Sequence, residues 1–352
     1  MDSNLDKFKD AFEAVAKADP QPTTVAIVVH ENPDPDCIGS ALGMQKLLKH
    51  FVSDVKCTIF YSGEISHPQN KTMMNLLNIQ MTDRADAEPL TQKSAQVFIV
   101  IDTTPERCGL KDINCLLTID HHKGDAKKCV VKDIRSVGSS SAIVWEYLNK
   151  AGVTFDKTDE DADIATALVI GIKTDTFDLS SENVSSLDFE AYRYLTGFMN
   201  QNKFAKIIKY PLPPYYFDLR SRLDQAGNTR IESGVFIGGI GYIVPSKRDA
   251  LPTIADERSR VEGTDTAFIF AIVGEDRVEV SVRSNALSID VNEIIQDIFG
   301  KERGGGKLGA GAAKIVLPFS LKDSSESIID GLWVAIRDFY MEKILQHIRM
   351  IK

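Results

Sequence analysis

The sequence predicts an α/β fold: a larger domain with a mainly parallel sheet flanked by helices, and a smaller α/β domain after it. Two observations support this prediction. Apolar runs of strand length alternate with helical patterns through the first half of the chain, which is typical of parallel sheets. In the second half, β-rich runs follow a cluster of prolines, and the 352 residues are enough for about two domains.

The larger domain, predicted over 1–201, opens with a helix, because Leu5, Phe8 and Phe12 lie at helical spacing. Apolar runs that predict buried strands follow at 23–29, 55–61, 96–102 and 115–120. Helical patterns lie between or after them, at 41–51, 141–152 and 161–175. This alternation predicts parallel strands joined by helices.

A connector is predicted over 202–230, where prolines interrupt regular structure before a short helical pattern at 217–227. The smaller domain follows over 231–322, with strands predicted at 235–244, 266–274 and 277–284. The last segment, 323–352, predicts an amphipathic helix that packs on the chain's own core rather than on a partner helix. Its apolar stripe contains Ile328, Leu332, Trp333, Ile336, Phe339, Ile344 and Ile348.

The composition excludes several classes of protein. With 41 Lys and Arg against 50 Asp and Glu, the net charge of -9 argues against a protein that coats long duplex nucleic acid. The five cysteines are odd in number and lack C-x-x-C spacing, so we expect reduced thiols and a cytoplasmic location. The acidic N-terminus does not resemble a signal peptide, and no apolar run of about 18 residues suggests a membrane span.

The strongest motif is HENPDPDCIGS at 30–40, where a predicted strand ends and a helix begins. Ligand sites in open α/β sheets lie at such positions. His30, Asp34 and Asp36 offer nitrogen and oxygen donors that suit a divalent metal such as Mn²⁺. The alternative is that Asp34 and Asp36 are only turn residues before the helix, with Asp36 or Ser40 acting near its N-terminus.

Acids and histidines also follow other predicted elements. Asp102 ends one apolar strand, where a carboxylate seldom serves packing. A further strand ends in Asp120, His121 and His122. Asp175 ends an apolar helix, where its charge opposes the helix dipole unless a cation lies nearby. Taken alone, the position of Asp175 indicates a solvated helix end. Taken together with the 30–40 motif and the two strand ends, it favours a ligand site.

This pattern resembles the DHH phosphoesterase superfamily. The matching features, in order, are the 30–40 motif, Asp102, Asp120-His121-His122 and Asp175. The smaller domain resembles the C-terminal DHH-associated domain through Ser281-Val282-Arg283-Ser284 and the glycine run at 304–311, so the resemblance covers nearly the whole chain. Within the superfamily, the chain is most similar to the two-domain oligoribonuclease (nanoRNase) and 3',5'-bisphosphonucleotide phosphatase branch.

The resemblance implies a site for two Mn²⁺ ions, with Mg²⁺ or Co²⁺ as alternatives. The implied ligands are His30 and Asp34 for one ion, Asp36, His121 and Asp175 for the other, and Asp102 for both. Two ions about 3.5 to 4 Å apart can share a carboxylate and activate a water. The resemblance also implies that His122 donates to a phosphoryl oxygen, while Asp120 orients a histidine.

Ser139 and Ser140 precede an apolar helix, where free amides and hydroxyls suit a phosphate; simple capping by serine is the alternative. In the smaller domain, we expect Gly305 and Gly306 to let the backbone approach an anion, although a flexible linker is the other interpretation. The glycine run follows a helix, so it is not a dinucleotide-binding loop, and a leucine occupies the Ser or Thr position that a Walker loop needs.

Positive charge near the glycine run comes from Arg283 and Lys307. The family's usual residue at position 307 is His. Lysine keeps a charge for phosphate, but it lacks the planar donors that base contacts use.

The expected function is hydrolysis of short oligonucleotides (nanoRNA) or nucleoside 3',5'-bisphosphates by a metal-activated water, with the smaller domain binding substrate across a cleft. Short substrates suit an acidic protein, because long duplexes would be repelled outside the site. The rival activities are a cyclic-dinucleotide phosphodiesterase and an inorganic pyrophosphatase or polyphosphatase. From another class, a catalytically inactive nucleotide sensor is the alternative. The sequence leaves a homodimer open.

Overall fold

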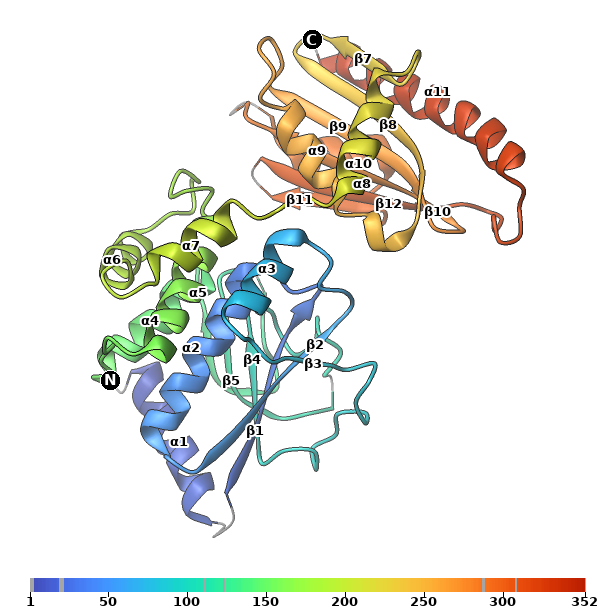
Figure 1. Cartoon of the computed structure of the whole chain (residues 1–352). Coiled ribbons are helices and arrows are strands. Elements are labelled where there is room, and N and C mark those ends of the chain that lie inside the picture. The colour runs from blue at the N-terminus through green and yellow to red at the C-terminus, as the bar shows by residue number, and fades with distance from the viewer. Residues whose placement is uncertain are drawn as a thin grey trace. The chain divides into compact units, whose positions relative to one another are not determined.

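A six-stranded parallel sheet forms the centre of the first of two units, Met1–Pro211 and Leu212–Lys352, into which the chain divides (Figure 1). The computed structural model describes residues 3–18, 22–110, 112–122, 124–286, 289–307 and 309–351, with the exception of the side chains at 307 and 351. The division falls inside the segment 202–230, which the sequence marks as a connector.

The strands of the first sheet lie in the order β3-β2-β1-β4-β5-β6, and each neighbouring pair is parallel. Their bounds are β1 Thr23–Glu31, β2 Val55–Ser62, β3 Thr82–Asp83, β4 Val97–Ile101, β5 Cys115–Asp120 and β6 Cys129–Ile134. The strand order reverses direction between β1 and β4. In open α/β sheets, ligands bind at such a switch point, outside the carboxyl ends of the strands.

The helices of the first unit pack against a core that contains Val25 and Ile27 of β1. Their bounds are α1 Asn4–Ala18, α2 Pro35–Phe51, α3 Pro68–Leu76, α4 Ser140–Lys150, α5 Asp159–Asp175, α6 Ser186–Leu195 and α7 Gln201–Ile208. The alternate residues Ala26 and Val28 belong to a smaller core formed with connecting segments, which include Leu110. Both faces of β1 are therefore buried, which explains its continuous apolar run.

Local sequence explains where two of the helices begin. Asp34 caps α2 by accepting from the Asp36 amide at 3.0 Å, and Pro35 is the first helical residue. Ser139 caps α4 by accepting from the Ala142 amide at 3.2 Å. Ser139 thus has the capping role that the sequence allowed, whereas α2 is capped by Asp34 rather than by Asp36 or Ser40.

Helices α2 and α5 approach closely because glycines lie between them. A Cβ at Gly39 would lie 2.6 Å from the carbonyl oxygen of Ala167. A Cβ at Gly171 would lie 2.4 Å from Ser141 Oγ and 2.9 Å from Asp36 Cα. These positions accept only glycine without movement of the backbone, and they bring the C-terminal half of α5 against the start of α2.

The second unit is a six-stranded sheet in the order β11-β12-β10-β9-β8-β7. Its strands are β7 Thr229–Glu232, β8 Val235–Ile243, β9 Thr266–Val273, β10 Arg277–Ser284, β11 Gly304–Lys307 and β12 Ala310–Val316. The β8/β9 pair is parallel and the other pairs are antiparallel. Its helices are α8 Pro214–Ser221, α9 Ala250–Arg258, α10 Val291–Phe299 and α11 Glu326–Ile351, with short 3-10 turns η1 Arg222–Asp224 and η2 Pro245–Lys247.

Helices pack on both faces of the second sheet. Helices α10 and α11 share one core with Val278, Val280 and Val282 of β10. Helix α9 belongs to a separate core, which contains Ala267 and Ile269 of β9. The alternation along β9 and β10 thus separates two cores, as the period-two pattern of the sequence predicts.

The C-terminal helix α11 packs on the core of its own unit through most of the predicted stripe. The residues that are buried or partly buried in this core are Leu332, Trp333, Ile336, Ile344 and Ile348. Ile328 and Phe339 are exceptions, with 58% and 59% of their surface exposed. Successive helical residues turn by about 100°, so Tyr340 takes the inward position and Phe339 turns outward, while Ile328 lies in the first turn, before the helix reaches the core.

The predicted fold class is confirmed: the structure contains a mainly parallel sheet with helices and a second α/β unit. The pattern at 217–227 forms an α-helix only to Ser221 and continues as the 3-10 turn η1 to Asp224. The glycine run at 304–307 forms strand β11 rather than a loop. Within the described parts of the chain, no helix has the length and apolar composition that crossing a membrane requires.

Candidate metal centre and substrate cavity

Three neighbouring strands end at one edge of the first sheet and present the predicted side chains there. His30 lies near the end of β1, Asp102 follows β4, and His121 follows β5. Because the carboxyl ends of parallel strands meet at the same edge, these residues lie close together although they are far apart in sequence. Asp36 at the start of α2 and Asp175 at the end of α5 reach the same edge.

Asp102 occupies the centre of this group. Its Oδ2 lies 3.4 Å from His30 Nε2, and its Oδ1 lies 3.4 Å from His121 Nε2. The residue is 2% exposed, and its φ of 60° is in the left-handed region that L residues rarely adopt. A hydrogen bond from the Asp102 amide to the Ile119 carbonyl, at 2.8 Å, holds this conformation. Strain of about 1 kcal/mol is typical of functional positions.

Candidate ligand atoms lie on both sides of Asp102. On one side, His30 Nε2 is 3.5 Å from Asp34 Oδ1. On the other side, His121 Nε2 is 3.0 Å from Asp175 Oδ2 and 4.0 Å from Asp36 Oδ2. The structure therefore brings together all six predicted metal ligands, in two groups that the carboxylate of Asp102 joins.

The electrostatics of the site reflect three carboxylates in a buried space. Burial, together with the charges of Asp102 and Asp175, raises the pKa of Asp36 well above its ordinary value. Burial alone would lower the pKa of His121, but Asp175, Asp102 and Asp36 raise it to about 10. A divalent cation among these groups would remove the repulsion between the carboxylates.

The donor atoms suit a divalent cation. Asp102 Oδ2 is buried and accepts no hydrogen bond within the described residues. His30 Nδ1 is 2.9 Å from the Glu31 carbonyl and His121 Nδ1 is 3.2 Å from the Val137 carbonyl, so each ring keeps Nε2 for a ligand. Imidazole nitrogens held in this way, with carboxylate oxygens, are the ligand set of borderline or hard divalent metals.

The start of α4 holds two of the carboxylates. The amides of Ser140 and Ser141 donate to Asp36 Oδ2 and Oδ1 at 2.7 and 2.9 Å, and Ser140 Oγ donates to Asp102 Oδ1 at 2.8 Å. Ser139 and Ser140 are fully buried. The helix start that the sequence suggested for a phosphate thus binds an anion of the chain itself, the carboxylate of Asp36.

A hollow of about 360 Å³ opens beside this centre and is lined in part by His30, Asp102, Arg107 and His122. His122 Nδ1 lies 2.9 Å from Asp120 Oδ1, and the His122 amide donates to the same oxygen at 3.0 Å. Asp120 therefore fixes the ring of His122 at the wall of the hollow. The sequence reasoning did not single out Arg107, although its place five positions after Asp102 in the loop was a usable signal.

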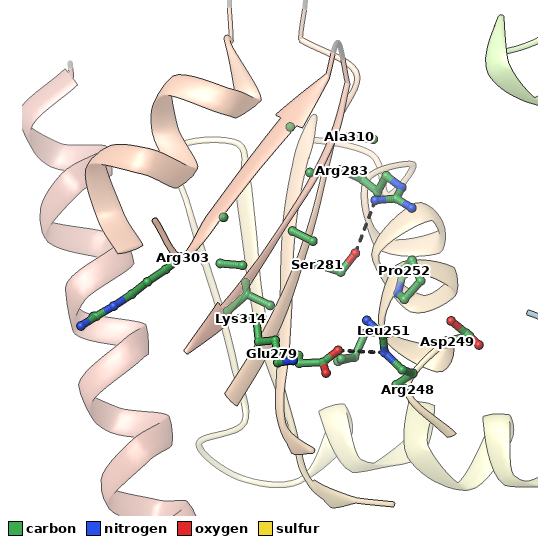
Figure 2. Close-up of a pocket in the computed structure, with 16 residues that line it drawn as sticks. Arg248, Asp249, Leu251, Pro252, Glu279, Ser281, Arg283, Arg303, Ala310 and Lys314 are labelled. Atoms are coloured by element: carbon green, nitrogen blue, oxygen red, sulfur yellow. Dashed lines mark hydrogen bonds and ion pairs between the residues drawn. The ribbon is translucent and has the colours of Figure 1, made fainter. Parts of the chain in front are cut away.

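The second unit has its own cavity of about 570 Å³, on the face of β10, β11 and β12 beside the start of α9 (Figure 2). Arg283 lines it and donates from Nε to Asp256 Oδ1 at 2.7 Å and from a terminal nitrogen to Ser281 Oγ at 3.4 Å. Gly306 also lines this cavity. Gly305 is the register partner of Ala312 in the β11/β12 pair.

The side chain of Lys307 lies outside the described part of the structure, and its backbone ends β11.

A second charged group, which the sequence reasoning missed, lines the same cavity. Glu279 accepts from Arg248 Nε at 3.0 Å and from Arg277 Nε at 2.7 Å, and Lys314 is its register partner on β12. Figure 2 shows Arg248 reaching Glu279 from the start of α9 and Arg303 pointing away from them. The carboxylate of Glu279 is thus paired with two arginines, of which Arg248 also lines the cavity.

Comparison with known proteins supports the class that the motifs predict for the first unit. Residues 24–172 match the DHH family, N-terminal domain, a segment that contains every candidate metal ligand except Asp175. This part of the chain is therefore similar to the DHH family, which supports the class that the motifs predicted. The match does not extend to the second unit.

One relative and one solved structure match most of the chain. An uncharacterized protein of Methanocaldococcus jannaschii is 33% identical over 322 residues, which make up 90% of this chain and 63% of that protein. The chain thus spans 63% of the length of this relative. The crystal structure of an exopolyphosphatase-related protein from Bacteroides fragilis matches with a TM-score of 0.66 at 15% identity, covering 96% of this chain and 97% of that chain. The likeness to this structure concerns the fold.

Proposed function

We propose that the chain is a metal-dependent phosphoesterase that hydrolyses short oligonucleotides (nanoRNA) or nucleoside 3',5'-bisphosphates. The observation that carries the proposal is the place of Asp102, whose two oxygens face His30 Nε2 and His121 Nε2 at 3.4 Å each. A carboxylate shared in this way suits two cations, and two-cation centres are typical of enzymes that hydrolyse phosphate esters. Mn²⁺ is the proposed metal.

His30 and Asp34 would hold one cation, Asp36, His121 and Asp175 the other, and Asp102 both. When bound, divalent cations at such a centre activate water and stabilise negative charge on phosphoryl oxygens. His122 would orient the substrate: Asp120 holds its Nδ1, and Nε2 would donate to a phosphoryl oxygen in the hollow. Arg107, on the wall of the same hollow, supplies a second charge for phosphate.

In the second unit, we assign the cavity beside β10 to the nucleotide part of the substrate. Arg283 supplies the positive charge and Gly306 a wall without a side chain, as the resemblance to a DHH-associated domain implies. Ser139 and Ser140 would act on the reaction indirectly, because Ser139 binds the carboxylate of Asp188 and Ser140 binds those of Asp36 and Asp102 rather than a phosphate. The contribution of Lys307 and of Gly305 to phosphate binding remains part of this proposal.

A substrate panel tests the proposed function. The full chain, supplied with Mn²⁺, Mg²⁺ or a chelator, is offered a dinucleotide, a nucleoside 3',5'-bisphosphate, a cyclic dinucleotide and pyrophosphate. We expect mononucleotides from the dinucleotide or orthophosphate from the bisphosphate, and no product with the chelator. Turnover of the cyclic dinucleotide or pyrophosphate alone would assign the site to one of those rival activities. Binding of nucleotide without turnover of any substrate would identify a sensor.

A further inference from the structure

Asp188, near the start of α6, is fully buried and accepts hydrogen bonds through both carboxylate oxygens. Oδ2 accepts from the Ser185 amide at 2.9 Å and from Ser185 Oγ at 2.7 Å, which is an ordinary capping box. The same Oδ2 accepts from the Gly138 amide at 2.9 Å, and Oδ1 accepts from Ser139 Oγ at 3.0 Å. These two contacts reach a segment about 50 positions earlier and are not needed for capping.

The contact between Asp188 and Gly138 is tight. A Cβ at Gly138 would lie 2.8 Å from Asp188 Cγ and 2.6 Å from Thr176 Cγ2. Only glycine fits between these two side chains without movement. Because Thr176 directly follows Asp175, the segment at 138–139 is held between α6 and the end of α5.

The segment that Asp188 holds continues directly into the start of α4. There the amides of Ser140 and Ser141 bind both oxygens of Asp36, and Ser140 Oγ binds Asp102 Oδ1. All of these groups are buried, so a shift of the segment is transmitted to both carboxylates with little room for repacking.

We infer that Asp188 is a positioning residue for the metal centre, which it orients through Ser139 and the start of α4. The inference rests on the proposed function, because it takes Asp36 and Asp102 to be metal ligands. Asp188 touches neither metal nor substrate in this account. Removal of a residue that orients a metal ligand typically lowers metal affinity about 10- to 100-fold.

The experiment measures Mn²⁺ binding to the metal-free full chain by calorimetry, so that the readout does not depend on turnover. Asp188→Ala removes all four contacts, and we expect it to weaken Mn²⁺ binding at least about tenfold. Asp188→Asn can turn its one carbonyl oxygen toward the three donors on Oδ2, so we expect it to recover most of the affinity. If Asp188→Ala does not fold, Ser139→Ala replaces it, with an expected fall about threefold or more.

Asp161 offers a matched control in the same unit. It is 6% exposed, accepts from the Asp156 amide at 2.7 Å and pairs with Lys46. It lies near the other end of α5 from Asp175, about 21 Å along the helix. We expect Asp161→Ala to lower the melting temperature as much as Asp188→Ala does, with unchanged Mn²⁺ affinity.

The outcomes separate the two proposals. If the unmodified chain binds no Mn²⁺, the proposed function fails and the inference about Asp188 fails with it. If the unmodified chain binds Mn²⁺ and Asp188→Ala binds it equally well, only the positioning role is overturned. An equal loss of affinity in Asp161→Ala also overturns it, because general destabilisation then explains the effect.

Discussion

The carboxylate of Asp102 approaches His30 Nε2 to 3.4 Å through Oδ2. Its other oxygen, Oδ1, lies 3.4 Å from His121 Nε2 and accepts from Ser140 Oγ at 2.8 Å. One side chain thus joins the two groups of candidate ligands, and its left-handed backbone turns it toward both. Loss of the Asp102 charge is therefore expected to weaken metal binding in both groups of candidate ligands.

Asp102→Asn is therefore expected to reduce Mn²⁺ binding at both positions rather than at one. Asparagine keeps the shape of the side chain but replaces one oxygen with a donor that repels a cation. Inductively coupled plasma mass spectrometry after dialysis against Mn²⁺ should show that the bound metal falls from about two equivalents toward zero. Asp54→Asn, at an exposed position in the same unit, is the control and should leave the stoichiometry unchanged. Loss of a single equivalent would contradict the shared role of Asp102.

If Arg283 binds the substrate as proposed and takes no part in the chemical step, Arg283→Ala is expected to raise KM for a dinucleotide about tenfold or more and to change kcat little. Its side chain is held by Asp256 and Ser281 at the cavity, so the charge is already oriented. Steady-state kinetics with Mn²⁺ measure both constants. Arg230→Ala, on exposed β7, provides the control and should leave KM unchanged. A fall in kcat with constant KM would place Arg283 in the chemical step instead.

The strand ends could be predicted from the sequence because parallel strands align their carboxyl ends. An acid or histidine directly after each apolar run therefore points to one edge of the sheet. His30, Asp102 and His121 follow this rule. In the structure, one carboxylate oxygen of Asp102 lies 3.4 Å from Nε2 of His30, and the other lies 3.4 Å from Nε2 of His121. The strand-end rule does not locate Asp175, which ends a helix. The position of its side chain depends on how α5 packs against α2.

The strands β3 and β6 were not predicted. β3 has two residues, and β6 is an edge strand that alternates buried residues with exposed ones such as Val130. Short or edge strands lack the continuous apolar run that identifies a central strand.

The contacts of Asp188 with Gly138 and Ser139 left no sign in the sequence, since tertiary hydrogen bonds between distant segments have no local pattern. The spacing of Ser185 and Asp188 predicts only a helix start. The roles of Ser140 and Ser141 as partners of Asp36 are hidden for the same reason.

The close packing around α2 predicts unequal results for two of its glycines, Gly39 and Gly43. Alanine at Gly39 would place Cβ 2.6 Å from a backbone oxygen, that of Ala167, so we expect the free energy of unfolding to fall by about 3 kcal/mol. Alanine at Gly43 would meet side chains rather than backbone, with Cβ 2.7 Å from Val144 Cγ1 and 3.2 Å from Leu168 Cδ2, and it gains up to about 1 kcal/mol in helix propensity. We expect Gly43→Ala to stay within about 1 kcal/mol of the unmodified chain.

Urea unfolding followed by tryptophan fluorescence measures this difference. The chain has two tryptophans, Trp145 in the first unit and Trp333 in the second, so a Trp333→Phe background reports on the first unit alone. Equal destabilisation by Gly39→Ala and Gly43→Ala would show that the backbone between α2 and α5 adjusts freely.

The same fluorescence probe tests a pH dependence at Glu146, the residue next to Trp145. Burial would raise the pKa of Glu146, but hydrogen bonds from Lys150 and Arg135 outweigh it and lower the pKa below the ordinary 4.5. Because the folded-state pKa is the lower one, ionised Glu146 stabilises the first unit above pH 4.5, and this contribution is lost as the pH falls through the folded-state value. Glu146→Gln should therefore lower the free energy of unfolding by about 1 kcal/mol near neutral pH, with a difference that narrows below pH 4.5.

The control for this prediction is Glu160→Gln. Glu160 pairs with Lys49 at 3.2 Å, but their side chains are 71% and 57% exposed, so solvent screens the pair. We expect this variant to change stability by no more than a few tenths of a kcal/mol, about the value of an exposed ion pair, at every pH. Unfolding curves of the two variants, recorded in the Trp333→Phe background from neutral to acidic pH, therefore separate a half-buried ion pair from a solvated one. A constant difference between Glu146→Gln and the unmodified residue across this range would mean that Glu146 acts through packing rather than charge.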